Sequence, residues 1–95
     1  MSARTELIKQ QLSTLNPERL EIEDQSHLHA GHTGAQSGGG HFAVLIVSPH
    51  FSGKSLLERH RMVYRALQSI MQTEIHALSI KAYAPDELLV NIQPS

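Results

Sequence analysis

Cysteine is absent from this chain of 95 residues. Without thiols, one copy of the chain can form no disulfide framework and can hold no metal site made only of cysteines. Long apolar runs are absent as well, because the longest, Phe42 to Val47, is far too short to cross a bilayer. The N-terminal residues show neither the pattern of an export signal nor an arginine-rich presequence. We therefore expect a soluble protein of a bacterial-like cytoplasm that does not associate with membranes.

Charge of one sign and catalytic motifs are also scarce. The formal net charge is −1, which is not typical of a dedicated nucleic-acid binder. No G-x-S-x-G motif is present, and Ser52-Gly53-Lys54-Ser55 ends like a phosphate-binding loop but lacks its upstream glycine. Glu21 and Glu23 are expected to be solvated charges on one face of a strand. The sequence therefore predicts a protein that is not an enzyme.

The hydrophobic pattern predicts the element order α-β-β-α-β, followed by a short terminal helix. The first helix can be capped by Ser2, and Asn16-Pro17 ends it. The later elements are expected as a strand at 19–23, a long loop at 26–41, a strand at 41–47, a helix at 56–70, a strand at 75–83, a short helix at 84–88 and a frayed tail at 91–95. A loop as long as 26–41 is usually functional or disordered.

These elements predict one α+β domain over residues 1–95, a two-layer sandwich in which two long helices cover a three-stranded sheet. The strand at 41–47 is apolar throughout, so we expect it to be central and buried on both faces. In the strand at 75–83, the alternation of residues places His76 on the apolar face together with Leu78, Ile80 and Ala82.

Histidine is the residue that the chain has in excess, with seven copies. Four of them, His27, His29, His32 and His41, lie close together in the sequence. Imidazole binds zinc, nickel, copper and iron, and it can replace cysteine on an iron–sulfur cluster. Histidine-rich loops often bind metals only adventitiously, however. A structural role is as plausible as metal binding for His76, and it is favoured for His60, which lies in the apolar stripe of the second helix.

The second predicted helix and its approach carry Lys54, Arg59, Arg61 and Arg65, which form a modest basic patch. Such a patch could contact nucleic-acid phosphates, but a solvated helix face is the ordinary explanation. Residues 31–34 match the GxxG loop of KH domains, although that loop joins two helices and these residues lie between two predicted strands.

Three segments together resemble one family. Residues 51–64 are similar to the BolA signature, in which a Phe-x-Gly turn leads into Arg-His-Arg-x-Val-Tyr. Residues 75–80 resemble the family's His-Ala-Leu strand, and His41-Phe42 stands where the family has His-Phe. The similarity covers residues 3–90. It implies a class II KH-like α-β-β-α-β fold without a functional GxxG loop, which agrees with the order of elements derived above.

The resemblance also implies a partner and a cofactor. Proteins of this family bind monothiol glutaredoxins and share a [2Fe-2S] cluster with them, in cluster assembly, trafficking or iron sensing. The glutaredoxin cysteine and glutathione supply thiolates, and the BolA chain supplies further ligands. The family's near-universal histidine falls on His76 and the second ligand falls on His32, with His29 and His41 as alternates because this loop is rich in histidine. Alone, the chain is expected to be a monomer or a weak homodimer.

A second implied role is transcriptional regulation during stress, with the long helix in contact with DNA. Lys54, Arg59, Arg61 and Arg65 are the residues expected to make that contact. Because the net charge is close to zero, binding to DNA is expected to be weak.

Overall fold

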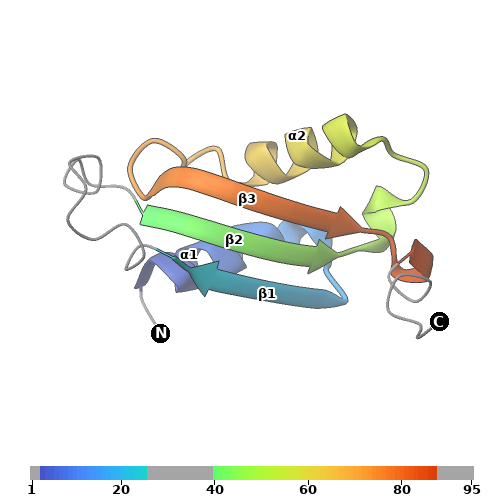
Figure 1. The fold of residues 1–95 in the computed structure, drawn as a ribbon, viewed down its shortest axis with the longest axis horizontal. Coiled ribbons are helices and arrows are strands. Elements are labelled where there is room, and N and C mark those ends of the chain that lie inside the picture. Colours follow the sequence, from blue (N-terminus) through green and yellow to red (C-terminus); the bar gives the residue numbers. More distant parts are fainter. Residues whose placement is uncertain (1–2, 26–39, 88–95) are drawn as a thin grey trace.

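The computed structural model describes residues 3–25 and 40–87 (Figure 1). Two α-helices, three strands and two short 3₁₀ turns make up the described part of the chain. In chain order they are α1 (Ala3–Leu12), η1 (Ser13–Leu15), β1 (Arg19–Asp24), β2 (Gly40–Val47), η4 (Pro49–Phe51), α2 (Leu56–Ala66) and β3 (Ile75–Tyr83). The predicted order of helices and strands is confirmed.

The three strands form one sheet in the order β1-β2-β3, so β2 is central as predicted. β1 runs antiparallel to β2, and β3 runs parallel to it. Val44 in the middle of β2 pairs with Ile22 on one side and with Ile80 on the other. Two neighbouring parallel strands must be joined by a crossover connection, and α2 lies within the connection between β2 and β3.

One face of the sheet carries the core, because both helices pack against it (Figure 1). Alternate residues of β2, namely Phe42, Val44 and Ile46, are buried on this face. They cluster with buried residues of both helices and of the turn after α2 (Ile8, Leu12, Val63, Leu67). Each such side chain contributes about 1.5–3 kcal/mol when it leaves water. The predicted two-layer α+β sandwich is confirmed.

The expectation that β2 is buried on both faces is wrong. From Gly40 to Ile46 its residues alternate between buried and half-buried, and His41, Ala43 and Leu45 are the half-buried ones. The physical reason is that α1 and α2 cover the same face, so no helix of residues 3–25 and 40–87 lies over the second face. Alanine and leucine on that open face gave β2 the continuous apolar run that typifies a strand buried on both sides.

The start of α2 is fixed by local chemistry. Gly53 adopts φ +74°, a conformation that side chains disfavour, and so turns the chain before the helix. Ser55 then forms a capping box with Glu58, in which the Glu58 N–H donates to Ser55 Oγ and the Ser55 N–H donates to the Glu58 carboxylate. Ser55 is therefore the N-cap of α2.

The end of α2 comes earlier than predicted, at Ala66 instead of Ile70. Beyond it the chain continues in tighter turns, with N–H groups of Gln68 and Ile70 donating to carbonyl oxygens three residues back. Leu67 and Ile70 are nevertheless buried. The apolar spacing of the predicted helix at 56–70 thus continues to the buried Leu67 and Ile70, although the backbone is no longer α-helical there.

Two further predictions, for β3 and for the short helix after it, can be compared with the structure. The third strand has the predicted bounds, and Pro85 begins a helical turn that runs to Glu87. Ser2, residues 26–39 of the predicted loop and the tail at 88–95 lie outside the described residues. Among the described residues, no helix has the length and apolarity needed to cross a membrane.

Candidate functional site

The beginning of β3 contains a bulge that determines how His76 is presented. Ile75 pairs with Gly40, but the next pair along the strands is Ala77 with His41. His76 is therefore the extra residue between two consecutive pairs. Ile75 is buried and His76 is exposed, so the prediction that His76 shares the apolar face of Leu78 is wrong. The irregular pairing interrupts the alternation on which that prediction depended.

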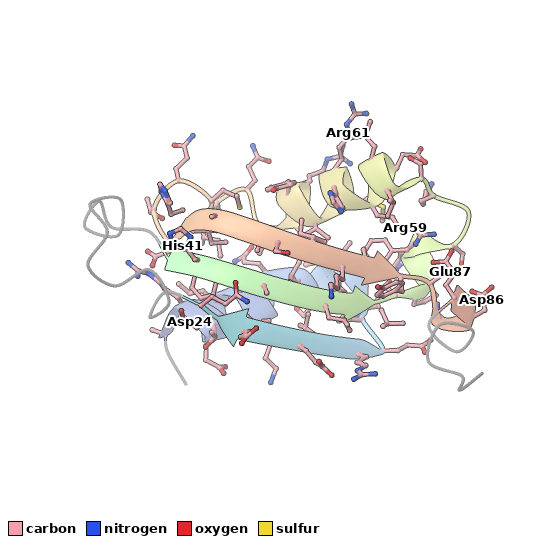
Figure 2. All side chains as sticks on the ribbon, in the orientation of Figure 1. Asp24, His41, Arg59, Arg61, Asp86 and Glu87 are labelled. Atoms are coloured by element: carbon pink, nitrogen blue, oxygen red, sulfur yellow. The ribbon has the colours of Figure 1, made fainter. Side chains whose placement is uncertain are left out.

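The bulge places the ring of His76 beside that of His41. His41 lies at the end of the sheet where β2 begins (Figure 2). The centroids of the two imidazole rings are 5.1 Å apart, and the ring planes are tilted by 55°. His41 is half-buried and His76 is open to solvent. We call these two residues the histidine pair. His76 is the residue that the family resemblance marks as a ligand. His41 is one of the two alternates to His32 for the second ligand.

Two adjacent imidazoles on an accessible end of a sheet suit a metal that accepts nitrogen ligands. Within residues 3–25 and 40–87, no three histidine or carboxylate side chains converge to hold a metal ion. A metal bound at the histidine pair would therefore need further ligands beyond these two imidazoles. His32 and His29 lie outside the described residues.

The other described histidines occupy different places. His50 lies in η4, beyond the opposite end of β2, where its Nε2 is 3.4 Å from Asn16 Nδ2. His60 is half-buried on α2, as the structural interpretation of its position expected. Neither of these residues forms the ring contact that defines the histidine pair.

Arg59 is not part of an exposed basic patch, and its assignment to nucleic-acid binding is a wrong prediction. Its side chain is only 8 % exposed and forms a two-pronged ion pair with Glu87, at 2.6 and 2.8 Å (Figure 2). The same guanidinium donates to the carbonyl oxygens of Lys54 and Ala82. All of these acceptors lie within the protein, so Arg59 fastens α2 to the end of β3.

The ion pair also controls the charge of Glu87. The hydrogen bonds from Arg59, followed by the bond from the Ala84 N–H, lower the pKa of Glu87 to about 2. Glu87 therefore stays ionised at any ordinary pH. Sequence analysis did not identify this partner, because 28 residues separate it from Arg59 and no local pattern links them.

The other three predicted cations, Lys54, Arg61 and Arg65, are exposed and line a hollow of about 250 Å³ beside α2. Figure 2 shows Arg61 pointing from α2 away from the sheet. Glu58 lines the same hollow, and its hydrogen bonds with Ser55 lower its pKa. The prediction of a modest basic patch is thus confirmed for three of its four residues.

By its fold, this is a small two-layer α+β protein with a histidine pair at one end of its sheet. A profile described as BolA-like protein matches residues 12–87. The chain belongs to the BolA-like family, as its sequence motifs suggested.

Relatives in several organisms support this assignment. "Protein BOLA1, chloroplastic" of Arabidopsis thaliana is 46 % identical over 77 % of this chain and 48 % of its own length. "DNA-binding transcriptional regulator BolA" of Escherichia coli is 34 % identical over 92 % of this chain and 80 % of its own. The solved BolA domain of SufE1 from Arabidopsis thaliana has a TM-score of 0.79 and 43 % identity, covering 92 % of this chain and 98 % of that domain.

The relatives differ in what surrounds the shared domain. "SufE-like protein 1, chloroplastic/mitochondrial" of Arabidopsis thaliana is 46 % identical over 78 % of this chain, but only 21 % of its own length is matched. Two of the most similar curated relatives are therefore less than half covered by this chain. The names of these relatives describe BolA-like or regulatory proteins and, in one case, a SufE-like protein.

Proposed function

We propose that this chain binds a monothiol glutaredoxin and shares a [2Fe-2S] cluster with it in the handling of iron–sulfur clusters. The observation that carries the proposal is the histidine pair, an exposed His76 whose ring lies 5.1 Å from that of His41. Membership of the BolA-like family and similarity to a protein named SufE-like support the same direction. The resemblance stated above supplies the partner.

The chemistry of the site fits such a cluster. The chain has no cysteine, so it can offer iron only nitrogen or oxygen ligands, and imidazole is the better of these. When bound, the cluster would supply one-electron redox chemistry, at a potential raised by nitrogen ligation. In this proposal His76 donates one nitrogen, His41 or His32 donates a second, and glutathione with the glutaredoxin cysteine supplies the thiolates.

Mixing this protein with a cluster-loaded monothiol glutaredoxin tests the proposal. We expect the two proteins to co-elute on gel filtration and the visible circular dichroism of the cluster to change, because a new ligand enters the shell of one iron. Visible absorption recorded in parallel measures how much cluster remains intact. Separate elution together with an unchanged spectrum would reject the partner and the cluster at the same time.

DNA binding is the second candidate function. The Escherichia coli relative is named as a DNA-binding transcriptional regulator, and three cations beside α2 are exposed. With Arg59 committed to Glu87, at most three side chains remain for phosphates, so log K should fall against log salt with a slope no steeper than about −2.7. An Arg61→Glu/Arg65→Glu variant should lose this binding in a gel-shift titration, whereas Lys81→Glu should not. Tight and sequence-selective binding at about 150 mM salt would instead place DNA binding first.

The compartment is part of the same proposal. We propose a cytoplasmic location, in line with the similarity of this chain to a transcriptional regulator of Escherichia coli. Fractionation of cells expressing the tagged protein tests this point independently of the partner.

A further inference from the structure

The exposed surface of α2 differs from the rest of the described chain in its apolar residues. Among residues 3–25 and 40–87, the large hydrophobic side chains that are exposed number three, and all of them lie on α2. They are Leu56, Leu57 and Tyr64, at 68, 59 and 41 % exposure. Leu57 and Tyr64 stand four residues before and three residues after Arg61, so these three side chains share one face of the helix. Exposed apolar side chains gathered on one element are typical of an interaction surface.

The flank of α2 that faces η1 carries a groove. The hollow lined by Lys54, Arg61 and Arg65 has Met62 and Arg65 in common with a second hollow of about 240 Å³, lined also by Leu15 and Ala66. The two hollows are therefore neighbours along α2, and we call them together the α2 groove. One half is lined mainly by apolar side chains and the other by cations. Methionine is well suited to such a floor because its side chain adapts to different apolar partners.

The cations of the α2 groove have no ion-pair partner among the described residues. No carboxylate lies within ion-pair distance of the side chains of Lys54, Arg61 or Arg65 in that part of the chain. Glu58, the one acid lining the groove, is already held by the N-cap of α2. The groove therefore keeps an excess of positive charge, although the chain as a whole has a formal charge of −1.

We propose that the exposed face and groove of α2 dock an acidic, amphipathic helix of a partner protein. The apolar side chains of that helix would contact Leu57, Tyr64 and the apolar half of the α2 groove, where Leu15 and Met62 lie. Its carboxylates would pair with Lys54, Arg61 and Arg65. Apolar residues and cations that alternate at helical spacing match the ridge of a second helix, which is how helix-in-groove recognition works. This site does not include the histidine pair, so it is independent of the glutaredoxin proposal.

Two other occupants fit the observations less well. Nucleic acid would use the cations but would leave the apolar side chains of Leu57 and Tyr64 against phosphates. A bilayer surface would accept the leucines and the arginines, but its flat surface would leave the apolar floor beside Leu15 unfilled. A helix of acidic and apolar residues uses every part of the surface.

A designed peptide tests the proposal with the full-length protein. The probe is a fluorescein-labelled helix of about 20 residues, with leucines on one face and glutamates beside them. A scrambled peptide of the same composition keeps the charge and loses the apolar face. Fluorescence anisotropy at about 150 mM salt should give saturable binding of the designed peptide, at least about tenfold tighter than that of the scramble.

Point variants then locate the site on α2. Arg61→Glu should weaken binding of the designed peptide about tenfold, and Leu57→Ser about fivefold. Both side chains are exposed, so the fold should be unaffected, which far-ultraviolet circular dichroism checks. Lys81→Glu is the matched control, because it reverses the charge of an exposed lysine on β3, away from α2, and should change affinity by less than about twofold.

Four outcomes would overturn the proposal. Equal binding of the scramble would show attraction by charge alone, and no saturation up to about 1 mM peptide would show that no such site exists. Tighter binding of a DNA duplex, weakened by Arg61→Glu but not by Leu57→Ser, would make the surface a nucleic-acid interface. Binding to phosphatidylglycerol vesicles that depends on both residues, without binding of the peptide, would make it a membrane-binding surface.

Discussion

Replacing Arg59 by alanine is expected to lower the free energy of unfolding by about 3 kcal/mol. The change removes the ion pair with Glu87 and two hydrogen bonds to backbone carbonyls, one of them the buried bond to Ala82. It also leaves a gap beside α2, because the arginine side chain is almost fully enclosed. Urea denaturation followed by circular dichroism measures the effect.

Arg61→Ala is the matched control, since it removes the same side chain two residues further along the same helix. Arg61 points into solvent, so its removal should change the free energy of unfolding by no more than about 0.5 kcal/mol. Arg59→Lys should fall between the two, because an ammonium group cannot make the two-pronged contact with a carboxylate. Equal denaturation midpoints for the two alanine variants would mean that the Arg59–Glu87 contact does not stabilise the fold.

The same ion pair predicts a dependence of stability on pH. The pKa of Glu87 is about 2 in the folded protein and close to 4.5 for an unperturbed carboxyl group. Because the folded pKa is the lower one, the contribution is complete above about pH 4.5 and is lost as the pH falls toward about 2. Glu87→Gln should remove this part of the acid sensitivity, so its stability should change less between these two pH values than that of the unsubstituted chain.

The sequence predicted the order of the elements because each has a clear local signal. The strand at 75–83 alternates, the turn before α2 contains Gly53, and the apolar spacing of 56–70 marks a helical face. The errors also have physical causes. Leu56 begins the apolar spacing of 56–70, but as the first residue of α2 it is 68 % exposed.

The assignment of Arg59 could have been corrected from the sequence. Arg59 precedes Val63 by four residues, so the two share one face of a helix, whereas Arg61 lies on the opposite side. The structure confirms this division, because Arg59 and Val63 are the buried residues of α2. Its partner Glu87 could not have been predicted, since the contact arises only when β3 brings the chain back to the start of α2.

The histidine pair, like the contact between Arg59 and Glu87, could not have been predicted from the sequence. His41 and His76 are 35 positions apart, and strict alternation would have turned His76 toward the core. The bulge between Ile75 and Ala77 reverses that orientation. No residue pattern in this stretch predicts the bulge. The parallel pairing of β2 with β3 then brings the two rings together. The family resemblance marked His76, but the geometry that makes His41 its neighbour comes from the sheet.

Replacing His76 by alanine is expected to abolish the change in visible circular dichroism that this protein induces in a cluster-loaded glutaredoxin. In the proposal His76 supplies a ligand to iron, and loss of one metal ligand usually destroys the spectroscopic signature of the site. Because His76 is exposed, the variant should remain folded, with a free energy of unfolding within about 0.5 kcal/mol of the original. An unchanged signal from His76→Ala would remove His76 from the ligand set.

His50→Ala is the matched control for this experiment. His50 is an exposed histidine in η4, and the length of β2 places it about 20 Å from the histidine pair. The His50→Ala variant should leave the spectrum unchanged.

The second ligand is identified with two further variants, His41→Ala and His32→Ala, tested in the same assay. A spectrum that responds to His41 alone would assign both nitrogen ligands to the histidine pair, whereas a response to His32 alone would assign the second ligand to the stretch between β1 and β2. If neither variant alters the spectrum, the role proposed for His41 is wrong, and His29→Ala then decides between the remaining alternate and His76 as the single ligand from this chain.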